Sequence, residues 1–254
     1  MTIALLPAPL PVAMPLLVAV PLLGAVMGSF LATAALRGAY GESLLHPPSH
    51  CRGCGRRLNA IDLLPILGYA LRRGRCTDCG TPIPALFPLA ETAGLLIGLS
   101  ALWQFAGADL LAALLFGLLL LAIALRDSRD FTIPDILSYG LILSGLGATA
   151  WLKPALLPEH ALAALLGGGL LALLAWGYKR LRGRDGMGWG DVKLLAGIGA
   201  WMGLHSLPMV VLLAALGGIA QAVWQSRGKP QATMMIPLGS WLGIAAWLLY
   251  VGQP

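Results

Sequence analysis

Carboxylates are scarce in this 254-residue chain, and two short segments place several of them beside long apolar runs. The chain has 11 Asp and Glu residues against 17 Lys and Arg residues. The first segment, RDSRDFTIPD, contains Asp127, Asp130 and Asp135, and the second, GWGD, ends at Asp191. A carboxylate at the edge of an apolar span is costly to desolvate, so these residues are candidates for function.

A pair of carboxylates suggests a definite chemistry. Two carboxylates in contact cannot both ionise cheaply, so the pair holds one proton and offers a base and an acid together. The base takes a proton from water and the acid protonates a scissile carbonyl, which is the chemistry of aspartic proteases. Spacing alone does not decide which of Asp127, Asp130 and Asp135 would partner Asp191.

The residues around Asp191 allow two interpretations. Gly188 and Gly190 would let a substrate backbone approach closely and would permit dihedral angles closed to other residues. The alternative is an ordinary loop before a helix, with Asp191 as the N-cap. Lys193 is either an electrostatic partner for a carboxylate or a marker of membrane topology, and the second role is favoured.

All the cysteines lie in two short motifs, CRGC and CTDC, with 21 residues between them. Two such motifs predict a structural zinc site, because four thiolates close a tetrahedron and stabilise a loop that lacks its own core. Two disulfides are the alternative, which a cytoplasmic location disfavours. His46 and His50 are interpreted as loop residues rather than ligands. The predicted ligands are Cys51, Cys54, Cys76 and Cys79.

The remaining sequence predicts the elements that position these groups. The chain is 58% hydrophobic and 11% charged, with a mean hydropathy of +0.81, which indicates an integral membrane protein. The fold class is therefore all-α: a polytopic bundle of about eight transmembrane helices with a small cytoplasmic zinc-ribbon-like domain. The predicted spans are residues 12–36, 85–106, 108–126, 133–152, 161–178, 191–204, 207–225 and 235–252, of which the sixth is the shortest.

Basic residues predict the orientation of the chain. With the amino terminus outside, Lys153 is the one Lys or Arg placed outside, and the others lie on the cytoplasmic side. Helix parity then brings Asp127 and Asp191 to one membrane depth at the cytoplasmic face. The first span is interpreted as retained rather than as a cleaved signal. Nucleic acid is not an expected partner, because the basic residues are explained by topology and by the lipid bilayer.

Three predicted domains follow from these features. Residues 1–36 form the first span, residues 37–84 the cytoplasmic zinc-binding domain, and residues 85–254 a transmembrane peptidase domain. The oligomeric state is not indicated.

Several motifs together resemble the bacterial type IV prepilin peptidases, which are membrane aspartic proteases of the GxGD kind. The resemblance covers nearly the whole chain. The motifs are GSFL (Gly28–Leu31), PPSHCRGC (Pro47–Cys54), LRRGRCTDCG (Leu71–Gly80), DSRDFTIPD (Asp127–Asp135), GMGWGDVKLLAGIGAWMG (Gly186–Gly203) and IPLGSWL (Ile236–Leu242).

This resemblance implies an activity and a site. Asp127 and Asp191 would be the catalytic pair, which cleaves the leader of prepilins and pseudopilins at the cytoplasmic boundary of the bacterial inner membrane. Asp130 would then be a loop charge, and Asp135 a residue that starts a helix. These substrates belong to type IV pilus and type II secretion systems. Many family members also methylate the new amino terminus with S-adenosylmethionine. Here Leu86, Phe87 and Pro88 replace the Arg-Tyr-Pro that often precedes the acidic position Glu91, and Glu91 either serves this second activity or caps a span.

Two other classes of protein remain alternatives. An ion-coupled transporter also uses carboxylates, but as proton relays near the bilayer centre, whereas these residues cluster at one rim. A zinc-ribbon scaffold that only assembles pilus machinery would tolerate loss of both aspartates.

Overall fold

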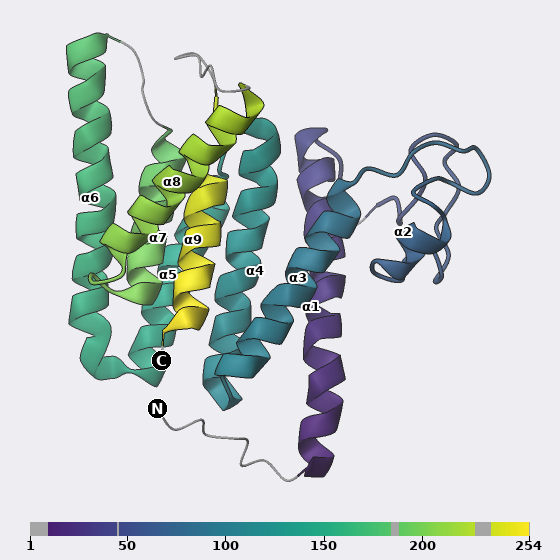
Figure 1. Cartoon of the computed structure of the whole chain (residues 1–254), viewed down its shortest axis with the longest axis horizontal. Coiled ribbons are helices and arrows are strands. Elements are labelled where there is room, and N and C mark those ends of the chain that lie inside the picture. Colours follow the sequence, from purple (N-terminus) through teal and green to yellow (C-terminus); the bar gives the residue numbers. More distant parts are fainter. Residues whose placement is uncertain (1–9, 45, 184–187, 227–234, 254) are drawn as a thin grey trace. The chain divides into compact units, whose positions relative to one another are not determined.

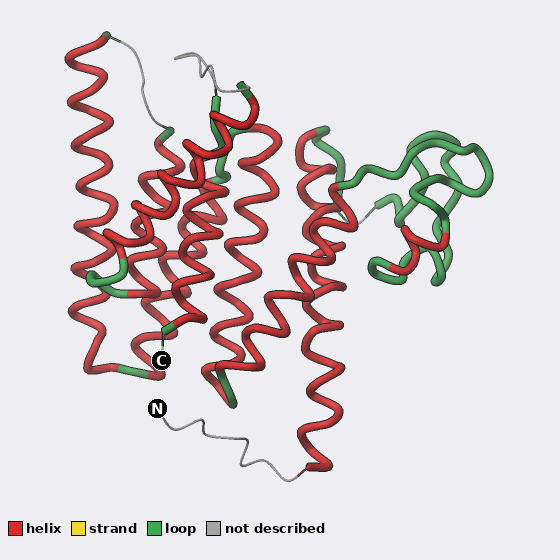
Figure 2. The backbone as a smooth tube through the Cα atoms, viewed as in Figure 1, coloured by secondary structure: helices red, strands yellow, loops and turns green. Residues whose placement is uncertain are grey.

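The computed structural model describes residues 10–44, 46–183, 188–226 and 235–253, and this described part is built from helices and loops (Figures 1 and 2). Its only β-type pairings among those residues are two isolated bridges in the cysteine-containing segment. The all-α prediction is confirmed. The helices are α1 (Leu10–Ala39), α2 (Leu67–Leu71), α3 (Leu86–Gln104), α4 (Gly107–Asp130), α5 (Asp135–Leu152), the 3-10 turn η1 (Pro154–Leu156), α6 (Leu157–Arg182), α7 (Trp189–Met202), α8 (Leu207–Gln225) and α9 (Leu238–Gly252).

The expected number of membrane spans needs correction. Each of the eight predicted windows contains a helix, but only six described helices are long and apolar enough to cross a membrane: α1, α3, α4, α5, α6 and α8. Helix α7 has 14 residues and so measures roughly 21 Å, shorter than the hydrocarbon core of about 30 Å. Nine of those residues are buried, so α7 is apolar because protein surrounds it.

The chain divides into two compact units, Met1–Leu110 and Leu111–Pro254. In the first unit, α1 and α3 pack antiparallel through glycines that recur every four residues. A Cβ at Gly24 would collide with the Gly94 carbonyl, and one at Gly28 with the Ala90 carbonyl. Small residues at this spacing let two backbones approach closely within a membrane.

In the second unit, α7 packs against its neighbours through small residues. A Cβ at Gly197 would lie 2.6 Å from the Leu141 side chain of α5, and one at Gly199 would lie 2.6 Å from the Ala163 carbonyl of α6. The Trp201 indole donates a hydrogen bond to the Leu141 carbonyl at 3.0 Å and stacks on Phe116 at 4.9 Å between ring centroids. These contacts fix the position at which α7 begins.

Gly167 and Gly168 of α6 form close helix contacts, because both glycines face α7 side chains or carbonyls. Gly169 faces open space instead, so only two of these three consecutive glycines contact α7.

Candidate active site and metal centre

Asp127 lies in the last turn of α4, because this helix continues past the predicted end at residue 126 to Asp130. The helix stops at Asp130, and the next residue, Phe131, has a left-handed φ of 51° and an amide that donates to the Asp127 carbonyl at 3.0 Å. Asp130 pairs with Arg126 one turn earlier, at 3.1 Å, so it is a helix-terminal charge rather than a loop charge. Asp135 begins α5, as predicted.

Asp191 is the third residue of α7. The N-cap is Gly188, so the alternative that made Asp191 the N-cap is wrong. The Asp191 side chain turns back to the backbone of Gly188, a contact typical of an acidic residue in the first turn of a helix. Residues 184–187, which include Gly186 of the predicted motif, lie outside the described residues.

The two carboxylates line one pocket in the second unit. This pocket has a volume of about 230 Å³. Asp127 and Asp191 are close enough for their charges to interact, whereas Asp130 and Asp135 do not line the pocket. Its walls come from the loop after α4 and from the start of α7: Asp127, Phe131, Thr132, Ile133, Gly188, Trp189, Gly190 and Asp191.

The glycines beside Asp191 have different roles. Gly188 has φ −73° and ψ 140°, which any residue can adopt, and an added Cβ there would lie 3.5 Å from the Asp191 carboxylate. A Cβ at Gly190 would instead lie 2.9 Å from Cβ of Ile133. Gly190 is therefore required for internal packing of the pocket wall, while Gly188 leaves the pocket open.

Ser240 was not singled out by the sequence, although its motif IPLGSWL was. It lies in the first turn of α9, where its amide donates to Oδ2 of Asp127 at 2.7 Å. Its hydroxyl lies 3.0 Å from the same oxygen and 3.2 Å from the Ala124 carbonyl. Both groups of Ser240 thus hold one oxygen of the Asp127 carboxylate in place.

Lys193 forms an ion pair with Asp135 at 2.6 Å between Nζ and Oδ1. Its ammonium also lies 5.2 Å from the centre of the Tyr139 ring. This contact supports the role of Lys193 as an electrostatic partner of a carboxylate, the first of its two possible roles. That carboxylate, Asp135, does not line the pocket.

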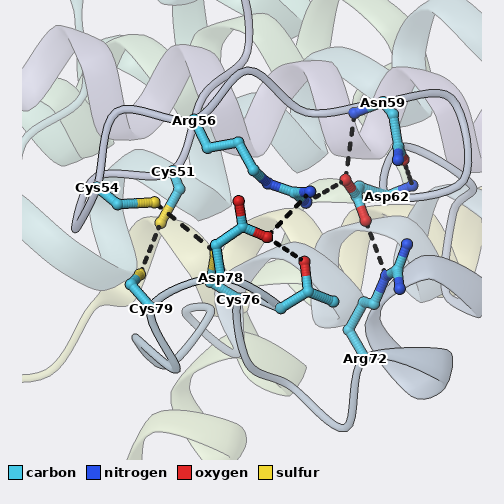
Figure 3. Close-up of polar contacts among 10 residues, drawn as sticks. Cys51, Cys54, Arg56, Asn59, Asp62, Arg72, Cys76, Asp78 and Cys79 are labelled. Carbon is cyan, nitrogen blue, oxygen red and sulfur yellow. Dashed lines mark hydrogen bonds and ion pairs between the residues drawn. The ribbon is translucent and has the colours of Figure 1, made fainter.

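The four cysteines form one cluster in the first unit, as the sequence predicted (Figure 3). Their Sγ atoms lie within 4.8 Å of one another, with Cys51 and Cys79 3.7 Å apart and Cys54 and Cys76 4.0 Å apart. Four thiolates around zinc at 2.3 Å would be separated by about 3.8 Å, so the donor set fits this ion. All four cysteines are free, which excludes the disulfide alternative, and the cluster includes neither His46 nor His50.

The two cysteine motifs fold into the same turn. The Cys51 amide donates to the Arg56 carbonyl at 2.8 Å, and the Cys76 amide donates to the Thr81 carbonyl at 2.9 Å. Gly55 and Gly80, each one residue after the second cysteine, have φ of 74° and 70°, which favours glycine.

The second turn also favours the thiolate that a metal requires. Hydrogen bonds from the side chain and the backbone of Thr81 lower the pKa of the Cys79 thiol to about 6. A lowered pKa favours the thiolate, which is the form that binds metal.

Asp62, which lies between two arginines, stabilises the loop that joins the cysteine motifs (Figure 3). Asp62 accepts from Arg56 at 2.6 Å and from Arg72 at 2.8 Å. Burial raises the pKa of Asp62, but hydrogen bonds from the Asn59 backbone and from Arg72 outweigh it and hold this pKa below its usual value.

Glu91 connects the same loop to the helices. It is buried in the second turn of α3, where it accepts from the Ser29 hydroxyl of α1 at 2.7 Å and from the Ile66 amide at 2.6 Å. The cap role considered for Glu91 is excluded, because the N-cap of α3 is Ala85.

Comparison with known proteins matches both units of the chain. Residues 22–105 match the family described as bacterial peptidase A24 N-terminal domain, and residues 113–223 match the type IV leader peptidase family. No solved structure matches the chain.

Relatives from several bacteria carry the name prepilin leader peptidase/N-methyltransferase. The protein from Burkholderia pseudomallei K96243 is 40% identical over 84% of this chain and 70% of its own length. The Aeromonas hydrophila protein is 35% identical over 81% of this chain and 72% of its own. The Pseudomonas putida protein is 36% identical over 80% of this chain and 71% of its own.

Proposed function

Because the chain belongs to the type IV leader peptidase family, we propose that it is a membrane aspartic endopeptidase for the leaders of type IV prepilins and pseudopilins. The observation that supports this function most directly is the pocket shared by Asp127 and Asp191. These two residues are 64 positions apart in the sequence and belong to different helices. The other carboxylates of the DSRDFTIPD motif lie outside the pocket.

In the proposed mechanism the two carboxylates hold one proton between them. The ionised group takes a proton from a water molecule, and the resulting hydroxide attacks the carbonyl carbon of the scissile peptide bond. The protonated group donates to the carbonyl oxygen. When the gem-diol intermediate collapses, the aspartate that took the proton from water gives it to the amine nitrogen as the C–N bond breaks. The other aspartate takes a proton from one gem-diol hydroxyl, so the pair again holds one proton.

The proposed site of cleavage is the cytoplasmic boundary of the bacterial inner membrane. Six apolar helices support membrane insertion, and the basic residues support an amino terminus outside. Asp127 lies at the end of α4 and Asp191 at the start of α7, so neither is in the middle of a span. This position disfavours the transporter alternative, which predicted carboxylates near the bilayer centre.

We further propose structural zinc in the four-cysteine site and a second activity. The zinc would hold Cys51, Cys54, Cys76 and Cys79 in the closed arrangement that their distances fit, without an open position for water. The second activity is methylation of the new amino terminus with S-adenosylmethionine, which is supported by the names of the relatives. The division into residues 1–36, 37–84 and 85–254 stays part of this proposal.

The test is cleavage of a prepilin by purified protein in proteoliposomes. We expect Asp127→Asn and Asp191→Asn each to abolish cleavage, because an amide cannot exchange the shared proton, while helix content and membrane insertion are unchanged. Asp130→Asn, in the same motif but outside the pocket, is the matched control and should retain cleavage. Normal cleavage by either of the first two variants would show that the aspartate pair is not the catalytic group, whereas no cleavage by the wild-type protein would favour the scaffold alternative.

A further inference from the structure

The loop between the cysteine motifs exposes an unusual amount of apolar side chain. We call residues 61–71 the leucine-rich segment; it includes the short helix α2 (Figure 1). Single exposed apolar residues are normal on a protein surface, but five within eleven residues form a patch that calls for a partner. The exposed side chains are Ile61 (51%), Leu63 (47%), Leu64 (45%), Leu67 (60%) and Leu71 (66%).

Contacts of Asp62 and Gly68 fix the conformation in which these apolar side chains are exposed. Asp62, whose side chain is 6% exposed, is held by Arg56 and Arg72. Gly68 is buried against the backbone of Asp62, where an added Cβ would lie 2.6 Å from the carbonyl oxygen. The charged side chain of the segment, Asp62, is therefore buried and paired, while the leucines are exposed.

The segment also lies at the depth of a membrane-spanning helix. The Ile66 amide donates to Glu91 at 2.6 Å, and Glu91 is the sixth residue of α3, about 7.5 Å along the axis from the start of that helix. Helix α3 is long and apolar enough to cross a membrane. The middle of the leucine-rich segment is thus level with the first two turns of a span.

Exposed arginines flank the same segment. Arg57 precedes it, and Arg73 and Arg75 follow it. Among the described residues none of these three forms an ion pair, so their charges are available to another molecule. Apolar side chains with flanking cations are the pattern of protein segments that lie in the interface of an anionic membrane.

We propose that the leucine-rich segment is inserted in the membrane interface, with its leucines among the upper acyl chains and Arg57, Arg73 and Arg75 against anionic phospholipid headgroups. The cysteine-containing domain is then held against the bilayer instead of extending freely into water. This inference requires that α3 spans the membrane, and it is independent of the chemistry of Asp127 and Asp191.

The test measures the surroundings of Leu71 in the full chain. A nitroxide amino acid is introduced at position 71, or at the exposed control position Thr77, and the protein is placed in nanodiscs of phosphatidylethanolamine and phosphatidylglycerol. The accessibility of the label to oxygen, which concentrates in lipid, is compared with its accessibility to a water-soluble nickel complex. Bound zinc is measured for each variant to show that the domain is folded.

We expect the label at position 71 to be at least threefold more accessible to oxygen than to nickel, and the label at position 77 to show the reverse order. Equal nickel accessibility at the two positions would overturn the proposal, because it would place the segment in water. Protection of position 71 from both reagents would also overturn it, since a protein surface would then cover the leucines. Neither accessibility measurement depends on prepilin cleavage, so failure of this proposal and failure of the proposed function are separate outcomes.

Discussion

At the scale of single residues, the two carboxylates of the pocket are held in different ways. Asp127 is buried, and both the amide and the hydroxyl of Ser240 reach its Oδ2 atom. The Asp191 side chain contacts the backbone of Gly188, the N-cap of its own helix. Ser240 therefore acts as a positioning residue for Asp127, which leaves Oδ1 for a water molecule or for Asp191.

We expect Ser240→Ala to lower kcat for prepilin cleavage about tenfold with little change in KM. The substitution removes the hydroxyl contact but keeps the amide, and one hydrogen bond to a charged group is worth about 1.5–3 kcal/mol. Ser240→Thr keeps a hydroxyl and should retain most of the activity. If alanine and threonine behave alike, the hydroxyl has no positioning role.

The glycines of the GWGD motif provide a second prediction at this scale. Gly190→Ala should lower the thermal unfolding midpoint, because its methyl group would collide with Ile133, and overpacking of this kind costs about 1–3 kcal/mol. Gly188→Ala should change the midpoint much less, since its added Cβ would lie 3.5 Å from the Asp191 carboxylate, an ordinary van der Waals contact. Unfolding of both variants in detergent, followed by tryptophan fluorescence, measures the difference; an equal loss would contradict the assigned contacts.

At the scale of elements, the position of α7 depends on close packing rather than on lipid. Its small residues lie against α5 and α6, and Trp201 both stacks on Phe116 and donates a hydrogen bond to the Leu141 carbonyl. Because Asp191 lies in the first turn of α7, any shift of this helix along α6 would move the carboxylate relative to Asp127. The packing of α7 is therefore part of the active-site geometry.

This dependence is tested by two glycines in helix interiors. Gly199→Ala should destabilise the protein and reduce cleavage several-fold, because the added methyl would lie 2.6 Å from the Ala163 carbonyl. Gly169→Ala is the matched control: it faces open space and should keep or slightly raise stability, as alanine favours helix. Measurements of cleavage rate and unfolding midpoint distinguish the two, and wild-type values for Gly199→Ala would refute the packing argument.

At the scale of the whole molecule, the chain separates its two kinds of site. The cysteine cluster and its bracing residues lie in the unit Met1–Leu110, and the carboxylate pocket lies in the unit Leu111–Pro254. The two family matches cover these units separately. Loss of metal should therefore act on the first unit directly.

We expect Cys51→Ser to reduce bound zinc and to speed amide hydrogen exchange in residues 37–84. This segment has no hydrophobic core of its own and would lose the metal that holds its two cysteine motifs together. Exchange in α7 should stay at the wild-type rate. Metal analysis and exchange mass spectrometry of the same sample provide both measurements. Unchanged zinc content would exclude the four-cysteine site.

The sequence by itself determined the features that are local or compositional. Apolar runs predicted a helix in every window, because helix formation in a membrane requires only a sufficiently long apolar stretch. The CRGC and CTDC spacing predicted the metal cluster, because each motif forms its turn from neighbouring residues. Helix parity also placed Asp127 and Asp191 at one membrane depth, and the resemblance to the prepilin peptidases, rather than spacing, implied that these two act as a pair.

Only the tertiary structure decided the features that depend on distant packing. It showed that α7 is a buried helix, that α4 continues through Asp127, and that Ser240 contacts Asp127 across 113 positions. An apolar sequence is the same whether lipid or protein surrounds the helix, so the sequence of α7 could not be distinguished from that of a membrane span. The partner of Asp127 depends on which helix terminus the folded bundle brings beside it, and no local spacing encodes that choice.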